Sequence, residues 1–195
     1  NFLFTSFQMM INYYINEIKK KQPFGPYFLG GWSFGGMVAF ELAKQLSDAG
    51  DQIAFVIMFD SFINESSVEE RGKYFLQNLK NRTGKSDLTL ETYLSKPYEN
   101  NCTILNEFNV SNYDASRVIL VASESTEEQI ILKNSFWERK VAFFETINTT
   151  MSHENFFDQD HAMESALIIN GVFRNYKENR AVSIIQAFFK SCYSK

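Results

Sequence analysis

The chain is poor in the residues that mark several classes of protein. Its 195 residues include only two cysteines and two histidines. The cysteines, Cys102 and Cys192, lie far apart and lack the spacing of a zinc site or of a disulfide framework, so we expect two free thiols. No apolar run approaches the roughly 18 residues that span a membrane, and no secretory leader is recognisable. These absences predict a cytoplasmic protein without a membrane segment.

The charge pattern is also plain. The formal net charge is -4 at pH 7, and the basic residues are scattered among acidic ones. Surfaces that bind nucleic acid usually gather Lys and Arg, so we expect no nucleic-acid partner. A hydrophobic content of 45% with 22% charged residues is typical of a globular protein, and we expect one domain over residues 1–195.

The pattern of apolar residues predicts alternating strands and helices. Strands are expected where short apolar runs end in polar residues or glycine, at 27–29, 53–59, 118–122 and 141–147. Helices are expected where apolar residues recur every three or four positions, at 7–18, 38–46, 162–176 and 181–189. The strand–helix–strand order predicts an α/β fold with a mostly parallel sheet and helices on both faces. Residues 64–116 are more polar and are interpreted as an insertion.

One serine stands among four glycines in the stretch Gly30-Gly31-Trp32-Ser33-Phe34-Gly35-Gly36. It fits the motif G-x-S-x-G between a predicted strand and a predicted helix, the context in which this motif forms a sharp nucleophile turn. That turn needs a positive φ at the serine and small neighbours around it. The sequence therefore predicts Ser33 as a nucleophile, with the backbone amide of Phe34 at the helix N-terminus as an oxyanion-hole donor.

A serine nucleophile needs a base, and the chain has two candidates, His153 and His161. His153 follows the predicted strand at 141–147 by a short polar loop, which places it at the carboxyl edge of the sheet, where parallel sheets build their sites. His161 is expected within the next helix. We therefore favour His153 as the base.

The base in turn needs a carboxylate that orients its ring. Asp60 and Glu124 each follow the end of a predicted strand, and both precede His153 in the chain. The residues alone do not separate these two. Asp114 and Asp158 are weaker candidates because neither directly ends an apolar strand.

The stretch from Gln22 to Ser61 resembles the thioesterase domains that end nonribosomal peptide and polyketide assembly lines, and more distantly the thioesterase of animal fatty acid synthase. The resemblance lies in four features: a Gln-Pro-x-Gly-Pro-Tyr lead-in, the serine turn, an Asp-Ser pair after the next strand, and a helix pattern formed by Ala39, Glu41, Ala43, Gln45 and Leu46. It implies the α/β-hydrolase fold.

The resemblance also implies roles for particular residues. The family's triad acid ends the strand after the serine, which makes Asp60 the preferred acid. The family's histidine lies in a Gly-x-His loop, whose place here is taken by Met151-Ser152-His153, without the glycine. The insertion at about 64–116 corresponds to the family's helical lid. Family members begin with several strands before the first helix; these are expected to be absent here, which leaves the second oxyanion donor unassigned.

By the same resemblance, the chain is expected to be an enzyme with no bound cofactor or metal. Its partner would be an acyl or peptidyl carrier protein, whose phosphopantetheine arm presents an acyl thioester, and the product would leave by hydrolysis or cyclisation. A stand-alone proofreading thioesterase shares these motifs. A carboxylesterase or lipase that acts on oxygen esters would carry the same serine turn. A hydrolase domain retained only as a docking surface is the non-enzymatic alternative.

Overall fold

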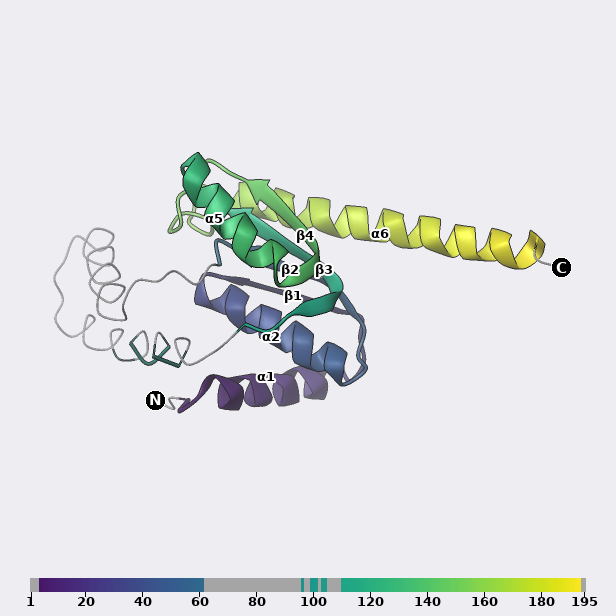
Figure 1. The fold of residues 1–195 in the computed structure, drawn as a ribbon, viewed down its shortest axis with the longest axis horizontal. Coiled ribbons are helices and arrows are strands. Elements are labelled where there is room, and N and C mark those ends of the chain that lie inside the picture. The colour runs from purple at the N-terminus through teal and green to yellow at the C-terminus, as the bar shows by residue number, and fades with distance from the viewer. Residues whose placement is uncertain (1–3, 62–95, 97–98, 102, 105–109, 194–195) are drawn as a thin grey trace.

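The computed structural model describes residues 4–61, 96, 99–101, 103–104 and 110–193 (Figure 1). Most of the insertion expected at 64–116 lies outside these residues. Its last four residues, 113–116, form the start of a strand. This strand therefore begins before residue 118, where the apolar pattern places its start.

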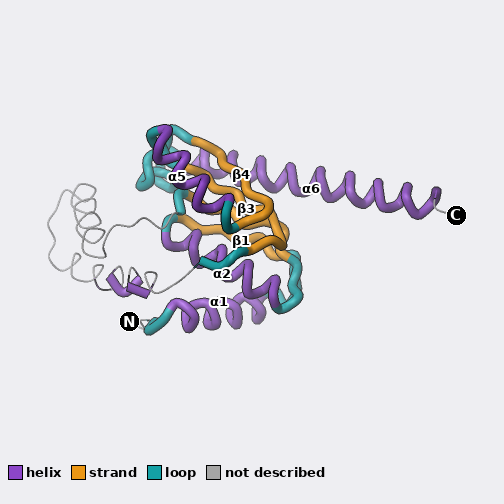
Figure 2. Tube along the Cα trace, viewed as in Figure 1, coloured by secondary structure: helices purple, strands orange, loops and turns teal. Residues whose placement is uncertain are grey.

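The described strands form one parallel sheet, shown in orange in Figure 2, in the order β1-β2-β3-β4. They are β1 (Tyr27–Trp32), β2 (Ile53–Phe59), β3 (Tyr113–Ala122) and β4 (Val141–Asn148). The helices are α1 (Phe7–Lys21), α2 (Phe34–Asp48), α5 (Glu127–Glu138) and α6 (Ala162–Tyr193). Because all strands run in the same direction, their carboxyl ends lie at one edge of the sheet.

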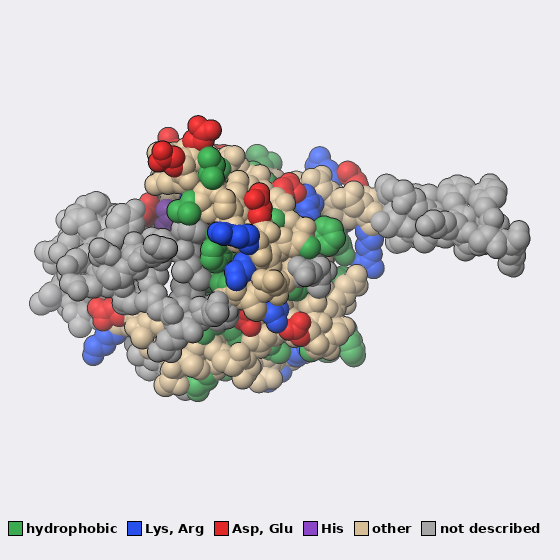
Figure 3. Space-filling view, in the orientation of Figure 1, with side chains coloured by type: hydrophobic (Ala, Val, Ile, Leu, Met, Phe, Trp, Pro, Cys, Tyr) green, Lys and Arg blue, Asp and Glu red, His purple; other side chains and the backbone are tan. Residues whose placement is uncertain are grey.

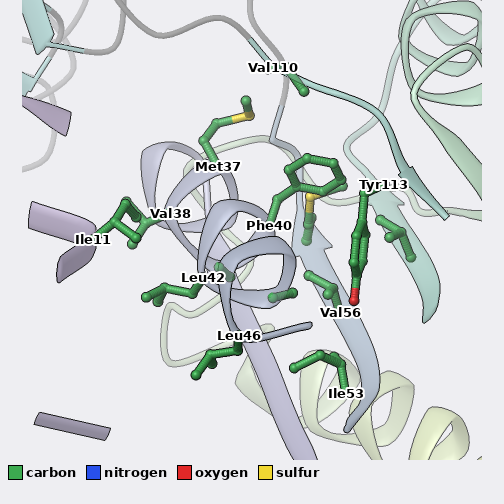
Figure 4. Packing of buried hydrophobic residues seen from close by; sticks show 14 of the residues in the cluster. Ile11, Met37, Val38, Phe40, Leu42, Leu46, Ile53, Val56, Val110 and Tyr113 are labelled. Carbon is green, nitrogen blue, oxygen red and sulfur yellow. The ribbon is translucent and has the colours of Figure 1, made fainter. Parts of the chain in front are cut away.

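Helices cover both faces of the sheet, as predicted. Strand β2 is buried along its whole length, and from Phe55 to Phe59 its side chains alternate between two apolar clusters. Val56 and Met58 pack toward α1, α2 and α5, whereas Phe55, Ile57 and Phe59 pack toward α6 and the loop before it. Figure 4 shows the first cluster from close by. A strand covered on both faces has no polar side, which explains the continuous run IAFVIMF.

Two boundaries differ from the sequence prediction. Strand β1 does not stop at residue 29 but continues to Trp32, with Gly30 and Gly31 paired to Ile57 and Met58 of β2. Glycine gives no apolar signal, yet its backbone extends without strain. The prediction of two closing helices is wrong, because α6 runs unbroken through residues 177–180, where the apolar pattern stops. Lys, Glu and Arg in that segment are good helix formers.

In the part of the chain that the structure describes, no helix is both long enough and apolar enough to cross a membrane. On the face shown in Figure 3, acidic and basic side chains are both scattered over the described elements.

Glu41 is a buried acid on α2, with 6% of its surface exposed. Its Oε1 accepts a hydrogen bond from Gln45 at 2.6 Å, whereas its Oε2 has no hydrogen-bond partner among the residues that the structure describes. Burial raises the pKa of Glu41, although the bond from Gln45 acts in the opposite direction. The folded protein therefore binds this proton more tightly than the unfolded chain does, and it loses stability as the pH rises above the ordinary carboxyl range.

We expect Glu41→Gln to stabilise the fold in a pH-dependent way. At pH 8 the variant avoids a buried, incompletely bonded carboxylate, so its melting temperature should rise by about 2–4 °C. Near pH 4, both the folded and the unfolded wild type hold the proton, and the gain should nearly vanish. Thermal unfolding followed by circular dichroism at both pH values measures this difference. An equal shift at both values would show that ionisation is not the cause.

Candidate active site

Ser33 occupies the turn between β1 and α2, at the carboxyl edge of the sheet. Its backbone has φ 54° and ψ -122°, a conformation that a residue with a Cβ rarely adopts. The turn is held by its N–H, which donates to the Phe59 carbonyl at 2.8 Å, and by its carbonyl, which accepts from the Gly36 N–H at 3.1 Å. The hydroxyl does not cap α2. The fold thus maintains a strained backbone and leaves the hydroxyl uncommitted to the helix.

Two of the glycines around Ser33, Gly31 and Gly36, are explained by the closeness of their neighbours. A Cβ on Gly31 would overlap the backbone carbonyl of Gly35, and a Cβ on Gly36 would overlap the hydroxyl of Ser61. Only a hydrogen fits at these two positions. Gly31 is therefore required by the packing of the turn itself and Gly36 by the contact of the turn with the residue after Asp60, whereas a Cβ on Gly35 would meet no described atom within 4 Å.

Phe34 is the first residue of α2. The first amides of a helix have no carbonyl partner within it and carry the positive end of the helix dipole. The amide of Phe34 therefore suits a developing oxyanion beside Ser33.

Asp60 follows β2 directly and is bonded to His153. Its Oδ2 lies 2.7 Å from Nδ1 of the histidine, and its side chain is 8% exposed. Its backbone has φ 45°, and its N–H donates to the Val121 carbonyl at 2.8 Å. Glu124, the alternative acid, has an exposed side chain, and its backbone N–H donates to the Met151 carbonyl. The structure therefore brings together Asp60 and His153, the pair preferred from the sequence.

Trp32 links the histidine loop to the serine turn. Its indole Nε1 donates to the His153 carbonyl at 2.8 Å, and the two rings lie 5.4 Å apart between centroids. Because Trp32 precedes Ser33 in the chain, this contact ties the loop that carries the candidate base to the serine turn. The sequence prediction missed this role, since the motif leaves the residue at this position unspecified.

His161 forms a separate pair with Asp158. Its Nδ1 lies 2.7 Å from Asp158 Oδ1 within the same short segment. His161 precedes α6, so the expectation that it lies inside a helix is wrong. Hydrogen bonds from His161 lower the pKa of Asp158. Asp114, another weak candidate acid, is the second residue of β3.

Two further residues donate hydrogen bonds to the Asp60 carboxylate. Lys133 of α5 donates to Oδ1 at 2.6 Å, and Ser123 donates its hydroxyl to Oδ2 at 2.8 Å and its N–H to Oδ1 at 3.3 Å. Burial alone would raise the pKa of Asp60, but the hydrogen bonds from His153, Lys133 and Ser123 outweigh it and hold that pKa well below its usual range. Asp60 is therefore an anion at neutral pH. Sequence reasoning missed both groups; the position of Ser123 after an apolar strand was the one usable signal.

The surroundings of the site are largely apolar. Phe157 is half exposed and packs edge-to-face against Phe59 at 4.9 Å and Trp32 at 6.5 Å between ring centroids. A mostly apolar cavity of about 860 Å³ lies between α1, β1 and α2 and reaches Phe34 and Gly35. Among the residues that the structure describes, no cluster of three or more His, Cys, Asp or Glu side chains could hold a metal ion.

Comparison with known proteins gives three kinds of match. Residues 2–86 match the family described as "Thioesterase domain". Curated relatives include an inactive atromentin synthetase of Paxillus involutus, 47% identical over 58 residues, which cover 30% of this chain and 6% of that protein. A norsolorinic acid synthase of Dothistroma septosporum is 45% identical over 56 residues, covering 29% of this chain and 2% of that protein. The matched segment is thus a small part of these relatives.

The third kind of match is to solved structures. The NocB thioesterase domain in covalent complex with a fluorophosphonate nocardicin G analog has a TM-score of 0.70 and 22% identity, over 89% of this chain and 77% of that one. ClbQ from the colibactin NRPS/PKS pathway has a TM-score of 0.69 and 14% identity, over 91% of this chain and 80% of that one. At these identities the likeness concerns the fold, and it confirms the predicted α/β-hydrolase fold.

Proposed function

Because the chain resembles a thioesterase domain of the nonribosomal peptide and polyketide synthetase type, we propose that it releases an acyl, polyketide or peptidyl group from a carrier protein. The group would arrive as a thioester on the carrier's phosphopantetheine arm and pass through an ester on Ser33. The observation that carries the proposal is the 2.7 Å contact between Asp60 and His153 at the edge of the sheet where the strained serine turn lies.

The proposed first half-reaction transfers the acyl group to the enzyme. The Nε2 atom of His153 takes the hydroxyl proton of Ser33 as its Oγ attacks the thioester carbonyl, and the Phe34 amide donates to the oxyanion. Asp60 accepts the Nδ1–H of His153, which keeps Nε2 free as a base and stabilises the imidazolium. The carbon–sulfur bond then breaks, and the leaving thiolate receives the proton from His153.

The second half-reaction repeats this chemistry with a new nucleophile. His153 takes a proton from water, or from an amine or hydroxyl of the acyl chain itself, and that atom attacks the Ser33 ester. The proton returns to Ser33 Oγ as the ester breaks. Water gives a free acid and an internal nucleophile gives a macrocycle, while Asp60 and His153 act in the same way in both. We propose no metal or bound cofactor for either step; the phosphopantetheine arm belongs to the substrate.

A matched pair of substrates tests the proposal. The same acyl chain is offered as a pantetheine-type thioester and as an oxygen ester, and release is followed by mass spectrometry. We expect kcat/KM to be higher for the thioester. A clear preference for the ester would replace the proposal with a carboxylesterase or lipase activity. Activity on free thioesters combined with preferential release of misloaded short acyl groups from carrier proteins would favour the proofreading role.

A further inference from the structure

Lys133 is a largely buried cation whose ammonium group faces the candidate triad acid. Its side chain is 14% exposed, and Nζ donates to Asp60 Oδ1 at 2.6 Å. Two hydroxyls surround the same nitrogen, Ser125 Oγ at 3.1 Å and Ser123 Oγ at 3.4 Å. The three oxygen partners match the three N–H groups of an ammonium ion. Lys133 is therefore held in one place by the polar groups that surround Asp60.

We propose that Lys133 is a positioning residue for the reaction, which holds Asp60 through Oδ1 so that Oδ2 stays directed at Nδ1 of His153. This inference rests on the proposed roles of Ser33, Asp60 and His153. Lys133 acts through the carboxylate, to which its ammonium group donates at 2.6 Å.

The division of the carboxylate between its partners supports the proposal. Oδ1 receives Lys133 and the Ser123 N–H, whereas Oδ2 receives His153 and the Ser123 hydroxyl. These four hydrogen-bond donors occupy the acceptor positions of the carboxylate. Rotation of the carboxylate about the Cβ–Cγ bond would therefore break several hydrogen bonds at once. Of the described donors to Oδ1, Lys133 is the stronger, because it carries a full charge whereas the Ser123 N–H is neutral.

Helix α5 carries Lys133 as a rigid support. A reciprocal capping box between Thr126 and Gln129 fixes its N-terminus. One turn after Lys133, the fully buried Trp137 donates its indole N–H to the carbonyl of Ser61 at 3.1 Å. Residues four apart lie on the same face of a helix. Two successive turns of α5 therefore bind two successive residues, Asp60 and Ser61, and fix the segment after β2.

The charge of Lys133 has two opposing effects on the reaction. Burial favours the neutral form of Asp60, and Lys133 helps to keep it an anion. The same cation repels a proton that arrives on His153. The direct contact to Asp60 is short and the charge on His153 lies beyond the carboxylate, so we expect alignment and ionisation of Asp60 to outweigh the repulsion.

Three variants of the full chain test this role. Lys133→Met removes the charge and the donor, Lys133→Arg keeps both, and Lys177→Met, at an exposed position on α6, serves as the matched control. The first measurement is the rate at which a fluorophosphonate probe modifies Ser33, followed by intact mass. The second is kcat and KM with a short acyl pantetheine thioester.

We expect Lys133→Met to slow both probe labelling and kcat by about 10- to 100-fold, the loss typical of one hydrogen bond to a charged group, with KM little changed. Lys133→Arg should recover most of the rate, and Lys177→Met should equal wild type. A residue with a purely structural role would change the folded fraction instead, so melting temperature is measured for every variant. If Lys133→Met does not fold, Lys133→Gln replaces it.

The possible failures are distinguishable. If wild type is labelled by the probe but does not turn over thioesters, the proposed substrate class is wrong, and the Lys133 variants are still compared by labelling. A folded Lys133→Met with unchanged or faster labelling would overturn the positioning role, faster labelling showing that repulsion of the proton on His153 dominates. Failure of Lys133→Arg to recover the rate would also count against it. A wild type that the probe does not label at Ser33 would overturn both proposals.

Discussion

Replacing Ser33 with alanine is expected to abolish formation of the acyl-enzyme and to lower turnover by about 10⁴- to 10⁶-fold, the scale on which loss of a serine nucleophile is felt. The fold should survive, because the Ser33 hydroxyl does not cap α2 and the backbone bonds that hold the turn remain. The strained φ of 54° is retained, since alanine also carries a Cβ. The effect should therefore appear in chemistry and not in stability.

Intact mass after mixing with a short acyl pantetheine thioester measures this effect, with product followed in the same samples. Ser47→Ala, in the last turn of the same helix, is the matched control and should behave as wild type. An adduct that persists in Ser33→Ala would place the nucleophile elsewhere. If a folded wild type forms neither adduct nor product, the proposed substrate class is wrong, and labelling of Ser33 by the fluorophosphonate probe then tells whether the serine is a nucleophile at all or the domain serves only for docking.

Asp60→Asn is expected to lower kcat by about 10⁴-fold, because the histidine would adopt the wrong tautomer. The carboxamide has one oxygen and one NH₂, and Lys133 can only donate. The asparagine oxygen should therefore turn toward Lys133 and the Ser123 N–H, on the side that Oδ1 occupies now. Its NH₂ would then face Nδ1 of His153, which must accept. The ring proton moves to Nε2, where it faces Ser33 and removes the base.

The second histidine–aspartate pair is the control for this variant. Asp158→Asn changes an identical chemical group that contacts His161 at the same 2.7 Å, and its activity should stay close to wild type. Steady-state kinetics of both variants, with melting temperatures measured in parallel, makes the comparison. Near-normal kcat in Asp60→Asn would show that Asp60 is not the triad acid. A large loss of activity in Asp158→Asn would show that the Asp158–His161 pair takes part in the reaction.

Part of the site could be predicted from the sequence because its signals are local. The turn around Ser33 needs a glycine at position 31, because a Cβ there would overlap the carbonyl of Gly35, four residues along the chain. Asp60 follows a continuous apolar run, which marks a buried strand, and the polar residue after the run marks where that strand ends. The parallel order of strands and helices follows from the same alternation of patterns, and the structure agrees with it.

Other parts were out of reach because apolar patterns do not report every boundary. The polar residues 177–180 end the apolar pattern but not the helix, since helix continuity depends on backbone propensity. Strand β1 continues through two glycines, and β3 begins within the polar segment interpreted as an insertion. In both places backbone hydrogen bonds to a neighbouring strand extend the strand beyond the residues whose side chains are apolar.

By itself, the sequence determined the alternating α/β order and the serine turn, and it offered Asp60 and Glu124 as candidate acids at strand ends, since each of these signals depends on residues that are neighbours in the chain. Only the tertiary structure decided that Asp60 meets His153, 93 residues away, and that Lys133 and Trp32 hold this pair from 73 and 121 residues away. Those contacts depend on the order and register of parallel strands and on how α5 packs against them. No local sequence pattern encodes contacts between residues so far apart in the chain, because these contacts form when the buried apolar faces of the sheet and the helices pack together.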